Sequence, residues 1–206
     1  MPTVDGRRER GDRTRQAVAA QAAALASVQG LSGMTLSQVA EALGVSKSSV
    51  QAAYATKEEV QLAAVAAATD TFLAAVVAPA QRQPEGLPRL RALVDAWLSY
   101  VERRVFPGGC FMVATLSEFD SRPGPVRDAL ANARQRWLAL LEHDAAIAQV
   151  AGDIPAAPPA AMLAFEIDAL LAAANVSRNL GDDTQALRLA RSLIAQRLGT
   201  DAHHDT

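Results

Sequence analysis

The sequence predicts an all-α fold, and three observations carry this prediction. Apolar residues recur at intervals of three and four along most of the chain, which is the period of an amphipathic helix. No stretch alternates apolar and polar residues in the manner of a strand. Prolines divide the helical pattern into segments, because proline ends or kinks a helix. These prolines are Pro79, Pro84, Pro107, Pro123 and Pro155.

Composition and charge bound the class of protein. A chain of 206 residues that is 50% apolar and 20% charged is an ordinary globular chain with one large or two small domains. The net charge of -2 excludes a uniformly basic surface, so any nucleic-acid contact must come from a local patch. The lone Cys110 and the lack of an apolar signal segment lead us to expect a cytoplasmic protein. Prolines and charges within the apolar run 154–176 argue against a membrane span.

The chain opens with an arginine-rich arm, and we expect residues 1–11 to be flexible. Acidic residues alternate with the arginines, so a solvated disordered tail and an arm that reaches DNA both remain open. The first helix is expected from about Thr14 to Gln29, with Gly30 as its stop. The arm arginines are Arg7, Arg8, Arg10, Arg13 and Arg15.

Two short helices follow, each framed by capping residues. Thr35 and Gln38 form a T-x-x-Q capping box, and Gly44 ends the helix that this box begins. Ser46 is the N-cap of the second helix, which ends near Tyr54. Helices this short are not stable alone in water, so the dense capping indicates that packing specifies their mutual angle. The pattern predicts a helix-turn-helix.

The second short helix supplies the predicted DNA-reading face. In a helix-turn-helix, the second helix enters the major groove with its N-terminal residues against base edges. Lys47 in its first turn can reach a guanine edge or a phosphate. Lys57 opens a longer helix at a third capping box, Thr56 and Glu59, and is placed to meet a phosphate. The exposed face is expected to consist of Lys47, Ser48, Gln51 and Ala52.

The rest of the chain reads as longer helices. They are expected at residues 57–78, 87–105, 109–120, 124–151, 156–180 and 183–198. We expect the tail, residues 200–206, to be disordered.

Residues 33–60, GMTLSQVAEALGVSKSSVQAAYATKEEV, resemble the helix-turn-helix of the tetracycline-repressor (TetR) family of transcriptional regulators. The resemblance implies an all-helical homodimer. Residues 1–56 would bind DNA, and residues 57–206 would bind a small molecule and dimerise. A second stretch, GGCFMVATLSEFDSRPGPVRDAL at 108–130, looks like a segment found in a subset of these regulators. The predicted DNA-binding residues are Thr35, Ser46, Lys47, Ser48, Ser49, Gln51, Ala52, Tyr54 and Lys57.

Aromatic residues predict where a ligand would bind. Of the nine aromatic residues, only Tyr54 precedes Phe72. A pocket for an apolar ligand is lined by apolar side chains with a few placed polar groups. The predicted lining residues are Trp97, Cys110, Phe111, Trp137 and Phe165.

The helix expected at 156–180 carries two apolar stripes, one through Met162 and Phe165 and the other through Leu163 and Ile167. A helix that is apolar on two sides must bury both. One face can pack on the protomer's own core and the other on a symmetry mate, as in a two-fold four-helix interface. An obligate homodimer is therefore expected.

The expected function is that of a repressor that a small apolar molecule releases from a palindromic DNA operator. Its partners would be double-stranded DNA, the effector and a second copy of the chain, without a membrane, cofactor or metal. One alternative is an architectural DNA-binding protein without a ligand, although that needs a longer basic surface. The least supported alternative is a helical enzyme, because no G-x-S-x-G, H-E-x-x-H or phosphate-loop motif is present.

Overall fold

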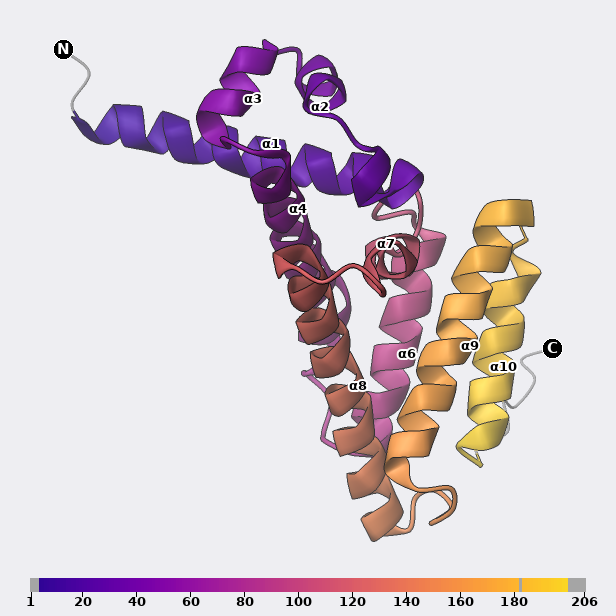
Figure 1. Cartoon of the computed structure of the whole chain (residues 1–206). Coiled ribbons are helices and arrows are strands. Elements are labelled where there is room, and N and C mark those ends of the chain that lie inside the picture. The colour runs from indigo at the N-terminus through magenta and orange to yellow at the C-terminus, as the bar shows by residue number, and fades with distance from the viewer. Residues whose placement is uncertain (1–3, 182, 200–206) are drawn as a thin grey trace. The chain divides into compact units, whose positions relative to one another are not determined.

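The computed structural model describes residues 4–181 and 183–199, and within these ranges it is helical and contains no strand (Figure 1). The predicted all-α fold is confirmed. Residues 1–3 and the tail 200–206, for which we expect disorder, lie outside the described residues. The elements are α1 (Val4–Gly33), α2 (Leu36–Leu43), α3 (Lys47–Ala53), α4 (Lys57–Phe72), η1 (Leu73–Val77), α5 (Ala78–Ala80), α6 (Leu87–Glu102), α7 (Phe111–Phe119), α8 (Pro125–Ala151), α9 (Ala160–Gly181) and α10 (Gln185–Arg197).

The chain forms two compact units. The first holds the chain up to Thr71 together with Phe106–Ala131, and the second holds Phe72–Val105 and the chain from Asn132 onward. Helix α7 therefore belongs to the same unit as α1, α2 and α3, although it lies far from them in sequence. The functional boundary between residues 56 and 57 stays a prediction, because packing divides the chain at other positions.

Helix α1 begins earlier than the sequence suggested. The flexible arm expected over residues 1–11 is corrected for residues 4–11, which are helical, and the helix start expected near Thr14 moves to Val4. Arginine and glutamate favour helices, and Glu9 and Arg13 form an i,i+4 pair at 3.9 Å. The predicted stop is confirmed as a break at Gly30, where φ is 78° and ψ is 161°, before one more turn ends at Gly33.

Capping residues frame α2 and α3 as predicted. Thr35 Oγ1 accepts a hydrogen bond from the Gln38 N–H at 3.2 Å, and Gln38 Oε1 accepts from the Thr35 N–H at 2.8 Å. Gly44 ends α2 in the left-handed conformation, and the Ser46 hydroxyl caps α3 by accepting from the Ser49 N–H at 3.1 Å. Helices α2 and α3 pack on each other and on α1, so that their angle is set by burial as well as by caps.

The third capping box is displaced by one residue. Thr56 Oγ1 accepts from the Glu59 N–H at 3.1 Å, as expected. The Glu59 carboxylate, however, accepts from the N–H of Ala55 at 2.8 Å, rather than from that of Thr56. A long side chain can reach either of two adjacent N–H groups, and the local backbone decides which one it caps.

The helical run from Lys57 to Ala80 contains five residues of π-helix, Leu73–Val77. The N–H of Ala78 donates to the carbonyl of Leu73, five residues back. Pro79 has no N–H, and in an α-helix its ring would clash with the carbonyl four residues earlier. A wider π turn relieves that clash, and the helix therefore continues past the proline instead of ending there.

The second unit contains α6, α9, α10 and most of α8. Helices α9 and α10 lie side by side (Figure 1), and both also contact α6. The helix expected from Ala156 begins only at Ala160, because Pro155, Pro158 and Pro159 precede it and proline does not continue a helix. Fully or almost fully buried side chains form the core of this unit: Leu90, Leu93, Leu98, Leu141, Ile167, Leu171 and Ile194.

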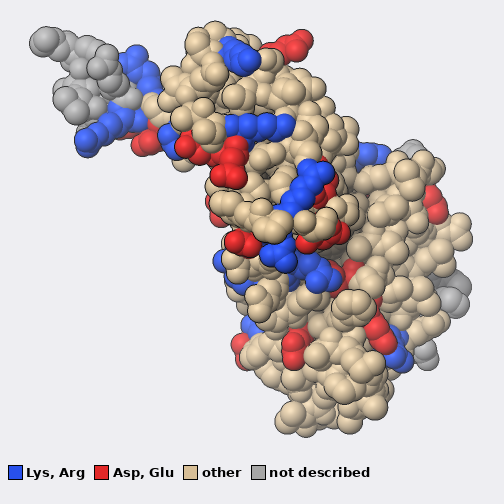
Figure 2. Space-filling view, in the orientation of Figure 1, with Lys and Arg blue, Asp and Glu red and all other residues tan. Residues whose placement is uncertain are grey.

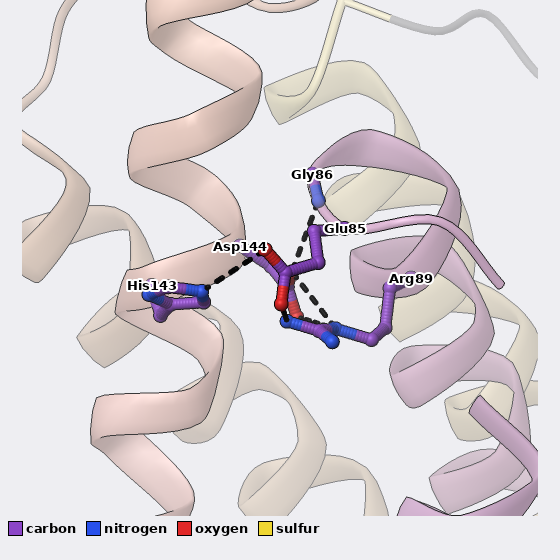
Figure 3. A network of polar contacts seen from close by, with 5 residues as sticks. All are labelled: Glu85, Gly86, Arg89, His143 and Asp144. Carbon is purple, nitrogen blue, oxygen red and sulfur yellow. Dashed lines mark hydrogen bonds and ion pairs between the residues drawn. The ribbon is translucent and has the colours of Figure 1, made fainter. Parts of the chain in front are cut away.

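A buried ion pair joins the start of α6 to the C-terminal half of α8 (Figure 3). Asp144 is fully buried and accepts from the N–H of Gly86, the N-cap residue of α6, at 3.0 Å. Its other oxygen lies 2.8 Å from Nε of Arg89, whose second partner is Glu85 at 3.1 Å. The hydrogen bond to Asp144 raises the pKa of Arg89 above its ordinary value, against the opposing effect of burial. His143 stays near the surface, with Nε2 3.7 Å from the Glu85 carboxylate.

We expect Asp144→Asn to lower the free energy of unfolding by about 3 kcal/mol, because it replaces the buried charged partner of Arg89 with a neutral one and leaves only the exposed Glu85 to balance the guanidinium charge. Urea denaturation measures this loss. The matched control is Asp95→Asn, which neutralises an exposed carboxylate paired with Arg191 and should cost less than about 1 kcal/mol. Equal losses for the two variants would contradict the role of burial.

Candidate nucleic-acid interface

The outer face of α3 presents the side chains that the sequence predicted to read DNA. Lys47, Ser48, Gln51 and Ala52 are all exposed, whereas Val50 on the opposite face is fully buried. Lys47 is the first residue of the helix, which is the position from which a side chain reaches base edges when such a helix enters the major groove. The helix therefore offers one lysine, one hydroxyl and one amide on a single accessible surface.

The serines at the start of α3 form a small network. The hydroxyl of Ser46 lies 2.8 Å from the hydroxyl of Ser48 and 2.8 Å from that of Ser49. Ser46 also caps the helix, and Ser49 is half-buried. Of the three predicted serines, Ser48 is therefore the one whose hydroxyl combines exposure with freedom from the capping bond.

Tyr54 anchors the end of α3 to α1. It is 8% exposed, and its hydroxyl donates to the carbonyl of Arg15 at 3.2 Å. The guanidinium of Arg15 lies 4.5 Å from the centre of the Tyr54 ring and donates to the carbonyl of Ala53 at 2.6 Å. A cation above an aromatic face is a favourable contact, and it here joins residues far apart in sequence. Both side chains thus hold α3 in place, a role that the sequence did not suggest for either.

Two further residues that the sequence predicted to bind DNA, Thr35 and Lys57, flank α2 and α3. Thr35 is exposed at the N-cap of α2. Lys57 is exposed at the start of α4, and its amine donates to the carbonyl of Ser32 at 2.7 Å. An ammonium group has three donors, so this bond leaves Lys57 with capacity for a phosphate oxygen.

The N-terminal end of α1 carries exposed charges of both signs. Figure 2 shows basic side chains gathered there, and Arg8, Arg10 and Arg13 are exposed on the helix. Glu9 and Asp12 are exposed among them, and Arg13 pairs with Glu9. Arg15 differs from the others because its guanidinium contacts Ala53 and Tyr54 at the end of α3. Whether this segment is only solvated or reaches DNA therefore remains open, but the segment is a helix and not a flexible arm.

The five residues predicted to line a ligand pocket fall in different parts of the fold. Cys110 and Phe111 belong to the first compact unit and are buried, with the Phe111 ring 6.0 Å from that of Phe106. Trp97, Trp137 and Phe165 belong to the second unit. Trp97 is 3% exposed and is therefore a core residue, whereas Phe165 is 60% exposed.

Trp137 lies in an aromatic cluster that includes polar groups. Its ring meets that of Phe72 edge to face at 5.2 Å, and Phe72 meets Tyr100 in the same manner at 5.8 Å. The indole N–H of Trp137 donates to Asp168 at 3.1 Å, and Arg134 pairs with the same carboxylate at 2.8 Å. Trp137, Arg134 and Asp168 are only partly buried, so the cluster combines apolar faces with accessible polar atoms.

Helix α9 divides its apolar residues between two faces. Leu163, Ile167 and Leu171 are buried, whereas Met162, Phe165 and Val176 are 56%, 60% and 45% exposed. On the adjacent α10, Leu189 and Leu193 are 53% and 47% exposed. The two apolar stripes that the sequence indicated are therefore present, and one of them is uncovered. We call Met162, Phe165, Val176, Leu189 and Leu193 the outer apolar face.

Two helical runs among the described residues, Lys57–Ala80 and Ala160–Gly181, are long and apolar enough to cross a bilayer. They are weak evidence for a membrane span, because core helices of soluble proteins meet the same criterion. Charged groups on α9 bind neighbouring helices: Asp168 pairs with Arg134, and Glu166 with Arg197 at 2.6 Å. The hydrogen bond from Arg197 lowers the pKa of the Glu166 carboxyl below its ordinary value. Such ion pairs fit a helix bounded by protein and water.

Comparisons with known proteins find similarity to tetracycline-repressor-like (TetR) regulators. A family model described as "Tetracyclin repressor-like, C-terminal domain" matches residues 86–194, and no curated protein matches significantly. A TetR transcriptional regulator from Chloroflexus aurantiacus J-10-FL is similar with a TM-score of 0.85 and 25% identity, over 94% of this chain and 98% of that one. A TetR-family regulator from Cytophaga hutchinsonii gives 0.78 and 20%, over 95% and 98%. AibR, solved with isovaleryl coenzyme A and operator DNA, gives 0.76 and 18%, over 91% and 99%.

Proposed function

Because this chain belongs to the tetracycline-repressor family of transcriptional regulators, we propose that it is a repressor that binds an operator as a homodimer and leaves it when a small molecule binds. The observation that carries the proposal is the capped pair α2 and α3, which holds Lys47, Ser48 and Gln51 on an exposed face. Its site of action would be the cytoplasm.

The DNA-binding residues that we propose divide by role. Lys47, Ser48, Gln51 and Ala52 would face the bases, since they share the outer surface of α3. Thr35 and Lys57 would meet phosphates. Ser46, Ser49 and Tyr54 would support this surface, because the Ser46 hydroxyl caps α3, the Ser49 hydroxyl bonds to that of Ser46 and the Tyr54 hydroxyl binds α1.

The outer apolar face supports the proposal of a homodimer. Five large apolar side chains on two adjacent helices are uncovered, and contiguous exposed apolar surface of this kind marks an interaction site. A second copy of the chain would cover it by packing its own α9 and α10 against the first pair around a two-fold axis. Phe165 would then belong to the dimer interface rather than to a ligand pocket.

The aromatic cluster of Phe72, Tyr100 and Trp137 is where we propose that the effector binds. Apolar faces with few polar groups fit a largely apolar small molecule, which Asp168 or Arg134 would orient. The structure of AibR contains both an acyl coenzyme A and operator DNA, which illustrates the pairing of partners that we propose for this chain. Trp97, which is buried in the same unit as the cluster, would support such a site from the core.

The switch would operate through two arrangements of the dimer. A helical run of 24 residues, Lys57–Ala80, begins after the helix-turn-helix and contains Phe72 of the aromatic cluster. An effector that favours the arrangement in which the two α3 helices no longer match the operator would release the DNA. Effector and operator would therefore be antagonists with a reciprocal coupling.

Lysine substitutions test the DNA-binding surface. The operator should consist of inverted half-sites about 34 to 36 Å apart, or a multiple of this spacing, and can be selected from a random DNA pool. Lys47→Ala should weaken operator binding most. Lys57→Ala should weaken binding to all sequences about equally and reduce the salt slope by about one.

The control is Arg82→Ala, which changes an exposed residue after α5 and should alter neither operator binding nor the salt slope. Binding that never distinguishes the selected operator from random DNA would instead indicate an architectural protein.

Charge placed on the outer apolar face should separate the protomers. Sedimentation at micromolar concentration should show a dimer for the wild type and a monomer for Leu193→Glu or Phe165→Glu, because each buries a carboxylate at the interface. Val150→Glu is the matched control, since Val150 is 91% exposed on α8 and is not part of the outer apolar face. A wild type that sediments as a monomer would disprove the obligate dimer.

Effector binding should oppose operator binding. Compounds that raise the melting temperature should weaken operator binding by about 5 to 150 fold, and operator should weaken compound binding by the same factor. Trp137→Ala should abolish the shift in melting temperature and keep operator binding. The control is Arg136→Ala, which changes the neighbouring exposed residue and should preserve both the shift and operator binding. Compounds whose binding depends on Trp137 but leaves operator affinity unchanged would contradict the switch.

A further inference from the structure

Side chains from two other helices satisfy the backbone at the end of α1. The N–H groups of Leu31 and Ser32 donate to the two oxygens of Glu118 on α7, each at 2.9 Å. Their carbonyls accept from α4, with Gln61 Nε2 bound to Leu31 at 2.9 Å and Lys57 Nζ bound to Ser32 at 2.7 Å. We call this arrangement of Glu118, Gln61 and Lys57 around Leu31 and Ser32 the turn clasp.

Two glycines allow α7 and the loop before it to approach α1 this closely. At Gly30 the φ of 78° disfavours any other residue, and a Cβ there would collide with the carboxylate of Glu118. At Gly108, a Cβ would collide with the carbonyl of Ser27, whose hydroxyl accepts from the Gly108 N–H at 3.1 Å. The break in α1 and the position of Glu118 are therefore parts of one fit.

The clasped turn leads directly into the DNA-binding elements. Leu31 in this turn and Met34 just after it are fully buried, and Thr35, the N-cap residue of α2, follows Met34. Arg122, just after α7, donates to the hydroxyl of Ser32 at 3.1 Å. The direction in which α2 leaves α1 thus depends on contacts from α7 as well as on contacts from α4.

Glu118 is the only member of the turn clasp that carries negative charge. A carboxylate near a DNA-binding surface opposes the approach of phosphates, so its charge alone would weaken binding to every sequence. Its hydrogen bonds have the opposite effect on specific binding, since they hold two N–H groups that a half-buried turn would otherwise leave unsatisfied. Charge and positioning therefore predict changes of opposite sign when Glu118 is replaced.

We infer that Glu118 is a positioning residue for DNA recognition, through which α7 sets the orientation of the helix-turn-helix relative to α1. The inference rests on the proposed function and extends it to a segment, 108–122, outside the DNA-binding helices. It assigns a physical role to the stretch GGCFMVATLSEFDSR, in which Gly108 and Glu118 contact α1 ten residues apart.

The test compares operator and random DNA for the full-length dimer. Glu118→Ala should weaken operator binding by about 10 to 100 fold, because a charged hydrogen-bonding partner of two N–H groups is lost. Binding to random DNA should stay equal or become tighter, because a negative charge is removed. Glu118→Gln keeps one acceptor oxygen and should show an intermediate loss.

Two control variants separate positioning from charge and from stability. Asp120→Asn removes an exposed carboxylate on the same segment. The hydrogen bond from Arg127 goes to the backbone carbonyl of Asp120 and is therefore kept. This variant should leave the ratio of operator to random binding unchanged. Val126→Ala truncates a side chain that is 3% exposed in the same compact unit. It should lower the melting temperature while the ratio of operator to random binding remains that of the wild type.

Each other outcome has a definite meaning. A wild type that prefers no selected sequence would overturn the proposed function and this inference together. A wild type that discriminates, with Glu118→Ala discriminating within twofold of it, would overturn this inference alone. Equal losses on operator and random DNA, or an equal loss for Val126→Ala at a matched melting temperature, would also overturn it, since they indicate general destabilisation.

Discussion

Helices α2 and α3 are too short to hold their own orientation. They contain eight and seven residues, and helices of this length are marginal in water without tertiary support. Their ends are therefore fastened by side chains from elsewhere. The turn clasp fixes the entry into α2, and the contact of Arg15 with Tyr54 fixes the exit from α3. Both attachments satisfy buried or half-buried backbone groups and so support the geometry of the exposed surface with Lys47.

In the second unit, helices α9 and α10 carry apolar residues on more than one side. Its inner faces bury leucine and isoleucine side chains, and the outer apolar face of α9 and α10 remains available for a second copy. Polar contacts then specify register where apolar packing alone would not. Asp144 ties α8 to the start of α6, and Asp168 ties α9 to Arg134 of α8. Because these carboxylates are wholly or partly buried, each of them requires its partner.

Local patterns in the sequence were sufficient for most of the elements. The capping box at Thr35, the glycine stop at Gly44 and the N-cap at Ser46 are interactions within four or five residues, and all three are present. Boundaries that depend on more distant contacts were less predictable. Helix α1 extends to Val4 through charged residues that looked like a flexible arm, and Glu59 caps Ala55 rather than Thr56. In both cases the composition allowed two conformations, and neighbouring structure chose between them.

The sequence by itself determined that the chain is helical, where a helix-turn-helix lies, and which side of it is exposed, because periodicity and capping act over a single turn of helix. Only the tertiary structure decided the partners of Tyr54, Glu118 and Asp144. Their contacts span 39, 86 and 58 residues of chain, and no local spacing rule applies at such separations. A carboxylate at residue 118 has the same local signature whether it faces water or caps a turn. The difference lies in the approach of α1, which Gly30 and Gly108 permit and which only the folded chain brings about.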